Sequence, residues 1–109
     1  AINDMFQNEG NAVPTPSLII SQVCKFYSID EAVLRGTQKN RGTSEARHVA
    51  IYLIRKLTNL SFPDIGKEFG KDHSTVMYSV KKVELAIKGD DTTMQNNIRD
   101  ITANINSCL

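Results

Sequence analysis

The sequence predicts an all-α domain of six helices. Apolar residues recur at helical spacing along most of the chain, side chains able to cap a helix precede these stretches, and no segment alternates as a β-strand does. The chain has 109 residues, of which 40% are hydrophobic and 23% are charged, as in one globular domain. No apolar run approaches the ~18 residues that cross a bilayer, so a membrane-spanning protein is not expected.

The domain is expected to occupy residues 17–109. Residues 1–16 form a linker or the end of a preceding helix, because Pro14 and Pro16 discourage a continuous helix into the domain. The two cysteines are expected to be reduced thiols of a cytoplasmic protein, because the first residues lack the pattern of a secretory signal. A disulfide between Cys24 and Cys108 is the alternative.

Two helices are predicted near the start of the domain. Ser17 can cap the first of them. Ser28, followed three positions later by Glu31, has the pattern of a capping box. A short second helix should therefore follow Ser28 and end near Gly36.

A polar loop and a long helix come next. The loop covers residues 37–42 and carries Lys39 and Arg41. The helix begins near Thr43, and apolar residues at helical spacing continue it to Leu57. Its basic residues lie on the remaining faces and are Arg47, His48, Arg55 and Lys56.

Three further helices are predicted in the second half of the chain. Ser61 and Asp64 form a capping box for the first, which stops at Gly70. Asp72 caps the second, and Gly89 ends it. These helices cover residues 62–69, 73–88 and 92–106. The predicted core consists of apolar positions on one face of each long helix: Ile20, Val23, Cys24, Tyr27, Ala46, Ala50, Leu53, Ile54, Leu57, Val76, Val80, Val83, Ile87, Met94, Ile98, Ile101 and Ile105.

The positive charge is concentrated in the middle of the chain. The formal net charge is only +1, but residues 35–88 contain eleven Lys or Arg against five Asp or Glu. Segregated positive charge is typical of a phosphate-binding surface, although a solvated helical face gives the same count. The charge distribution therefore makes nucleic acid a candidate partner.

The two helices on either side of Gly70-Lys71-Asp72 have the pattern of a helix-turn-helix. The first is short, the connection contains glycine, and the second is longer and begins with His73, Ser74 and Thr75. Short polar side chains at a positive helix terminus can approach base edges closely. The alternative is that they are ordinary residues of a capped first turn.

Three runs between residues 50 and 83 form a longer pattern. They read LTNLSFPDIG at 57–66, FGKDHSTV at 69–76 and KKV at 81–83. The pattern resembles the C-terminal DNA-binding domain, domain IV, of the DnaA family of bacterial replication initiators. The resemblance implies a helix-turn-helix domain of the Trp-repressor-like type. Where the family usually has Gly-Gly-Arg-Asp-His-Thr-Thr-Val, this chain has one residue fewer in the turn and a serine at Ser74.

The resemblance also implies which residues contact DNA. Asp72, His73, Ser74 and Thr75 would read the major groove of the family's asymmetric box. Lys39 or Arg41 would enter the minor groove, which favours arginine and hence Arg41. Contacts to the sugar-phosphate backbone would come from Arg47, His48, Arg55, Phe62, Pro63, Lys71 and Lys82. For the basic residues the alternative is a solubilising charge, and for Phe62 it is packing against its own helix.

The implied partner is double-stranded DNA, bound by a monomer in the bacterial cytoplasm in association with the nucleoid. No membrane binding is predicted. The chain would need no cofactor of its own, although an ATP-binding module would lie upstream if it is a fragment of an initiator. One alternative is a stand-alone DnaA-like regulator or mobile-element protein that does not act in initiation. Another is a protein-interaction module whose basic face is incidental.

Catalytic, nucleotide and metal sites are not predicted. Asp72, His73 and Ser74 are consecutive on a helix, so their side chains diverge by about 100° each instead of converging as a triad does. The segment 66–71 lacks the spacing of a phosphate-binding loop. The histidines and cysteines have no metal-ligand spacing, so the chain is not expected to be an enzyme.

Overall fold

The computed structural model describes residues 13–36 and 40–109, and these residues form six α-helices and no strand. The prediction of an all-α domain of six helices is confirmed. No helix in these two stretches is long and apolar enough to cross a membrane. The helices are α2 (Pro16–Tyr27), α3 (Glu31–Arg35), α4 (Arg41–Leu57), α5 (Phe62–Phe69), α6 (His73–Lys88) and α7 (Thr92–Ser107).

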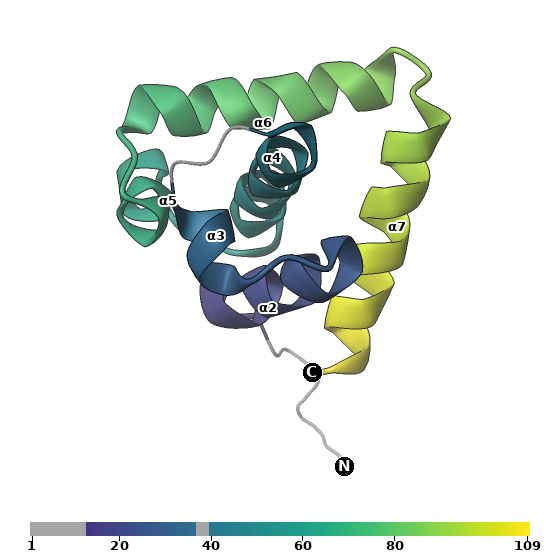
Figure 1. Cartoon of the computed structure of the whole chain (residues 1–109), viewed down its shortest axis with the longest axis horizontal. Helices are drawn as coiled ribbons and strands as arrows, with labels where there is room; N and C mark the ends of the chain where they lie inside the picture. The colour runs from purple at the N-terminus through teal and green to yellow at the C-terminus, as the bar shows by residue number, and fades with distance from the viewer. Residues whose placement is uncertain (1–12, 37–39) are drawn as a thin grey trace.

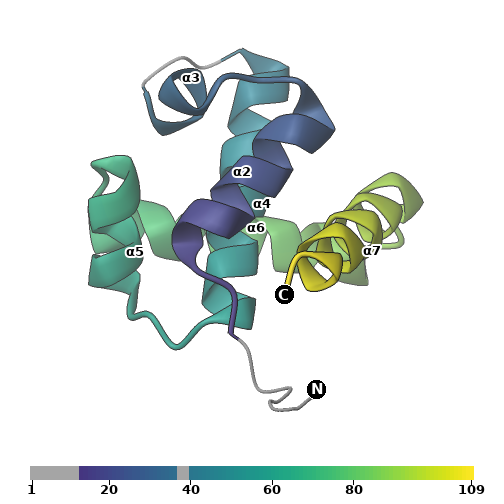
Figure 2. The same cartoon turned by 90° about the horizontal axis from the view of Figure 1, so that it is seen from below.

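Helix α4 lies at the centre of the domain and contacts each of the other five helices (Figure 1, Figure 2). Figure 1 shows α6 across one side of α4, with α5 at one end of α6 and α7 at the other, while α2 and α3 lie on the opposite side. Every predicted core residue is buried or packs against the buried cluster. The fully buried large side chains come mainly from α2, α4 and α7 and include Ile19, Ile20, Ile51, Leu53, Ile54, Ile101 and Ile105.

The start of α2 differs from the prediction. The helix begins at Pro16, and its cap is Thr15, whose hydroxyl accepts a hydrogen bond from the Leu18 N–H at 3.1 Å. The predicted cap at Ser17 is wrong, because proline fits the first helical position, where its fixed φ and missing N–H carry no cost. The expectation of free thiols is confirmed, since no disulfide joins Cys24 and Cys108. Burial raises the pKa of Cys24.

The predicted capping box at Ser28 is also wrong. Ser28 ends α2 in the left-handed conformation at φ 56°, and its N–H bonds back to the Cys24 and Lys25 carbonyls. The residue before α3 is Asp30, which makes no side-chain cap bond. A left-handed residue commonly follows the last turn of a helix, because its N–H then satisfies the last carbonyls, as the N–H of Ser28 does here.

Helix α4 begins two residues earlier than the expected Thr43. The Asn40 side chain accepts from the Thr43 N–H at 2.9 Å, so Arg41 is the first helical residue. Arg41 therefore lies on a helix and not in the predicted polar loop. Lys39 lies outside the described residues.

The later cap prediction at Ser61 is confirmed, because Ser61 accepts from the Asp64 N–H at 3.2 Å. Asp91, which was not predicted as a cap, accepts from the Met94 N–H at 2.9 Å before α7. Gly70 ends α5 at φ 63°, a conformation that glycine adopts at little cost, and Gly89 ends α6.

Candidate nucleic-acid interface

Helices α5 and α6 are joined by a turn that packs directly on the backbone of α5. The Gly66 carbonyl accepts from the N–H groups of Gly70 and Lys71. Gly66 is buried, and a Cβ atom built on it would collide with the Lys71 carbonyl oxygen. Only glycine allows this approach, so the short turn holds α6 at one fixed position against α5.

The first turn of α6 presents its side chains to solvent. The Asp72 carboxylate accepts from the Thr75 N–H at 2.9 Å and caps the helix, as predicted. The hydrogen bonds from Thr75 lower the pKa of Asp72, so the carboxylate stays charged. His73, Ser74 and Thr75 are all exposed. These three side chains therefore stand on a rigid, capped helix start with no role in the core.

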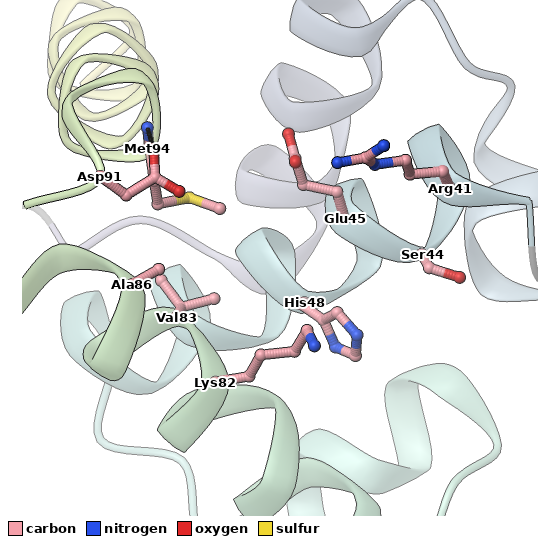
Figure 3. Close-up of a pocket in the computed structure, with 9 residues that line it drawn as sticks. All are labelled: Arg41, Ser44, Glu45, His48, Lys82, Val83, Ala86, Asp91 and Met94. Carbon is pink, nitrogen blue, oxygen red and sulfur yellow. Dashed lines mark hydrogen bonds between the residues drawn. The ribbon is translucent and has the colours of Figure 1, made fainter. Parts of the chain in front are cut away.

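A pocket of about 410 Å³ lies between α4, α6 and the start of α7 (Figure 3). His48 and Lys82 line it, and Figure 3 shows the Lys82 side chain extending toward the His48 ring. The Nδ1 atom of His48 lies 2.8 Å from the Ser79 hydroxyl oxygen. Burial, followed by the charges of Lys82 and Arg47, lowers the pKa of His48. The pocket thus brings His48 of α4 next to Lys82 of α6.

The other end of the pocket contains Arg41. Its side chain is exposed and projects from the first turn of α4, on the same helix as Ser44 and Glu45 (Figure 3). Asp91 lies on the far rim at the start of α7. The pocket is therefore mixed in charge, with its cations toward α4 and α6.

Arg55 lies beside the start of α5. It is exposed and donates to the Leu60 carbonyl at 3.0 Å, and its guanidinium carbon lies 4.2 Å from the centre of the Phe62 ring. Phe62 is half-buried and packs against the core cluster, while Pro63 is exposed. The ring and the guanidinium thus orient each other at the surface.

Two residues predicted to touch the DNA backbone are engaged inside the domain. Arg47 is buried, and it donates to the carbonyls of Leu34 at 2.8 Å and Val33 at 3.4 Å. Burial lowers the pKa of Arg47. The half-buried Lys71 places its ammonium 3.5 Å from the Gly36 carbonyl. Both cations hold the end of α3 against the rest of the molecule.

Sequence reasoning did not single out Arg35 and Tyr78. Arg35 donates to the Glu68 main-chain carbonyl and pairs with the carboxylates of Glu31 at 3.0 Å and Glu68 at 3.4 Å, which ties α3 to α5. The residues next to Arg35 in the sequence do not predict its contact with Glu68, because the two are far apart along the chain. Tyr78 is exposed on α6, four positions after Ser74. That spacing puts both on one helical face and could have identified Tyr78.

The comparisons with known proteins agree with this architecture. A family model described as the bacterial DnaA protein helix-turn-helix matches residues 16–83. The chain is 39% identical over 92 residues to the chromosomal replication initiator protein DnaA of Caldanaerobacter subterraneus subsp. tengcongensis. The aligned segment covers 84% of this chain and 20% of that relative. It is 40% identical over 99 residues to the protein of the same name from Cutibacterium acnes, covering 89% of this chain and 20% of the relative.

A third relative of the same name, from Pelobacter propionicus, is 42% identical over 88 residues, covering 80% of this chain and 19% of the relative. The chain thus spans about a fifth of the length of the relatives it matches. The matched segment includes α5, the turn and most of α6. From the fold, the helix-turn-helix geometry and these matches, the chain belongs to the family of the bacterial DnaA helix-turn-helix.

Proposed function

We propose that this chain binds double-stranded DNA in a sequence-specific manner, at the DnaA box of a bacterial replication origin. The first turn of α6 would read the major groove, and Arg41 would reach the minor groove. No catalytic step is part of the proposal. The protein would act as a monomer, because the family's box is asymmetric, and it would be associated with the nucleoid in the cytoplasm.

The observation that carries the proposal is the exposed first turn of α6. His73, Ser74 and Thr75 are polar, exposed and fixed in direction by the Asp72 cap and by the close packing at Gly66. A helix N-terminus carries a partial positive charge, and its first residues are those that enter the groove in helix-turn-helix proteins. Side chains that stabilise no core at such a position are suited to reading base edges.

Basic residues near the helix-turn-helix support the proposal. Lys82 of α6 lines a pocket with His48 of α4, and Arg55 lies beside Phe62 at the start of α5. Contacts to phosphate position a domain on DNA without reading its sequence, and they need charges spread around the reading helix. Arg47 and Lys71 are left out of this set, because their donors already serve the α3 carbonyls.

The direct test is a binding titration of the chain with two labelled duplexes, one carrying the DnaA box and one with its bases scrambled. At physiological salt the box duplex should bind at least ~10³-fold more tightly. Binding to both duplexes should weaken as salt increases, because phosphate contacts release counterions. Equal affinity for the two duplexes would contradict the proposal and favour a protein-interaction module.

Replacing His73 or Thr75 with alanine should identify the reading side chains. Each change should reduce affinity for the box by ~1–3 kcal/mol while binding to the scrambled duplex stays nearly unchanged. Neither residue supplies the helix cap, since the acceptor belongs to Asp72, so the melting temperature should remain close to wild type.

The matched control is Thr93→Ala. Thr93 is likewise exposed in the first turn of a helix capped by aspartate, but it belongs to α7, away from the helix-turn-helix. It should leave both affinities unchanged. A selection from random duplexes provides the decisive measurement: the same base preferences for wild type, His73→Ala and Thr75→Ala would show that this turn does not read the groove.

A further inference from the structure

Tyr78 is a large aromatic side chain left in solvent on the outer face of α6. It is 59% exposed, although α6 buries Val76 and Val80 on its other face. The helix periodicity places Tyr78 on the same face as Ser74, one turn further along. A residue so exposed contributes little to the core, so its ring and hydroxyl are accessible to a partner outside the domain.

Two side chains, a histidine and a lysine, lie against the Tyr78 ring. The His48 ring meets it edge to face, with 6.0 Å between the centroids and 69° between the planes. The Lys82 ammonium lies 5.8 Å from the centre of the same ring. His48 is itself held by Ser79, at 2.8 Å. The ring is therefore oriented by side chains from both α4 and α6.

We propose that Tyr78, His48 and Lys82 form one phosphate-binding cluster, in which the Tyr78 hydroxyl donates a hydrogen bond to a phosphate of the bound DNA. This inference rests on the proposed function. When the first turn of a recognition helix enters the major groove, the residues of the next turn face the wall of the groove, where the phosphates lie. Tyrosine is one of the side chains that donate to phosphate oxygens.

The neighbours of Tyr78 favour phosphate over a base edge. The Lys82 ammonium beside the ring attracts an anion, whereas a thymine methyl group would be recognised by apolar surroundings. Lys82 and His48 also line the pocket shown in Figure 3, which has Arg41 at its other end.

Tyr78→Phe tests the hydroxyl alone, because the ring and its contacts remain. The variant should bind the box duplex and the scrambled duplex about tenfold more weakly than wild type, the usual effect of losing one hydrogen bond to a charged group. The slope of log affinity against log salt should not change, because a neutral donor releases no counterion. Lys82→Ala should instead reduce that slope by about one.

The matched control is Tyr52→Phe. Tyr52 also has a lysine four positions later, with the Lys56 ammonium 5.7 Å from its ring centre, but Lys56 is paired with the Glu84 carboxylate at 3.4 Å. A lysine neutralised in this way offers no phosphate site, so Tyr52→Phe should bind both duplexes as wild type does.

A set of box duplexes with single neutral methylphosphonates locates the contact. At one position, neutralisation should weaken wild-type binding about tenfold more than it weakens Tyr78→Phe binding, because the variant has already lost the hydroxyl bond, while the Lys82 contact to that phosphate is lost in both proteins. Wild-type affinity in Tyr78→Phe, or changed base preference, would overturn the phosphate assignment while leaving the proposed function intact. If wild type itself does not distinguish box from scrambled duplex, the proposed function fails, and this inference with it.

Discussion

Replacing Gly66 with alanine is expected to lower the free energy of unfolding by about 3 kcal/mol. The added methyl group would collide with the Lys71 carbonyl oxygen, which belongs to the main chain of the turn. A side chain could rotate away, but here the turn itself must shift, so the cost lies at the upper end of that for overpacking a core. For a domain of this size, the melting temperature should fall by more than about 10 °C.

The same substitution should also impair DNA binding below the melting transition. Moving the turn should change the angle between α5 and α6, which pack against each other. The first turn of α6 should then no longer fit the major groove when the rest of the domain is bound to the DNA. The loss should be greater for the box duplex than for the scrambled duplex, because non-specific binding depends mainly on charge.

Gly42→Ala is the matched control for stability. Gly42 lies in the first turn of α4, and the nearest atom to an added Cβ would be the Asn40 side-chain oxygen at 3.9 Å. Alanine should fit there and raise stability by up to about 0.5–1 kcal/mol, because glycine loses more backbone entropy in a helix. Thermal unfolding measures both variants. A wild-type melting temperature for Gly66→Ala would mean that the turn does not pack on α5 as described.

Replacing Arg47 with methionine is expected to cost about 2–3 kcal/mol of stability and to lower the melting temperature by about 10 °C. Methionine fills most of the volume of the arginine stem but cannot donate a hydrogen bond. The Leu34 and Val33 carbonyls at the end of α3 would then lose their Arg47 donor. The Val33 carbonyl keeps the Gly36 N–H as a donor at 3.2 Å, so the desolvation penalty of a buried acceptor without a partner falls on the Leu34 carbonyl, and the attachment of α3 to α4 should loosen.

Arg47→Met also separates a structural role from a phosphate contact. A structural role predicts a lower melting temperature with an unchanged salt slope for the folded protein. A phosphate contact predicts the reverse, a wild-type melting temperature with a slope reduced by about one. Arg99→Met provides the control, because Arg99 is exposed on α7 and pairs with the neighbouring Asp100 at 3.7 Å, so its loss should change stability by less than about 0.5 kcal/mol.

The short-range features of the fold could be predicted from the sequence. Asp72, Gly70 and Ser61 mark the ends of α5 and α6 because a cap depends on groups within four residues along the chain. The incorrect start predicted for α4 also has a local cause. Gly42 favoured a loop at this point, but the Asn40 side chain caps the helix, so α4 begins earlier than predicted.

The helix-turn-helix, the capped first turn of α6 and the core positions could be predicted from the sequence, because they follow from spacing and composition. The role of each cation depends on the tertiary structure. Arg47 and Arg55 are both basic residues of α4, but Arg47 is buried against carbonyls 13 and 14 positions away, while Arg55 stays exposed over Phe62. A basic residue near the edge of an amphipathic helix face has the same sequence spacing whether its side chain is buried or exposed. Which of the two occurs depends on whether a helix from a distant part of the chain packs over that side chain.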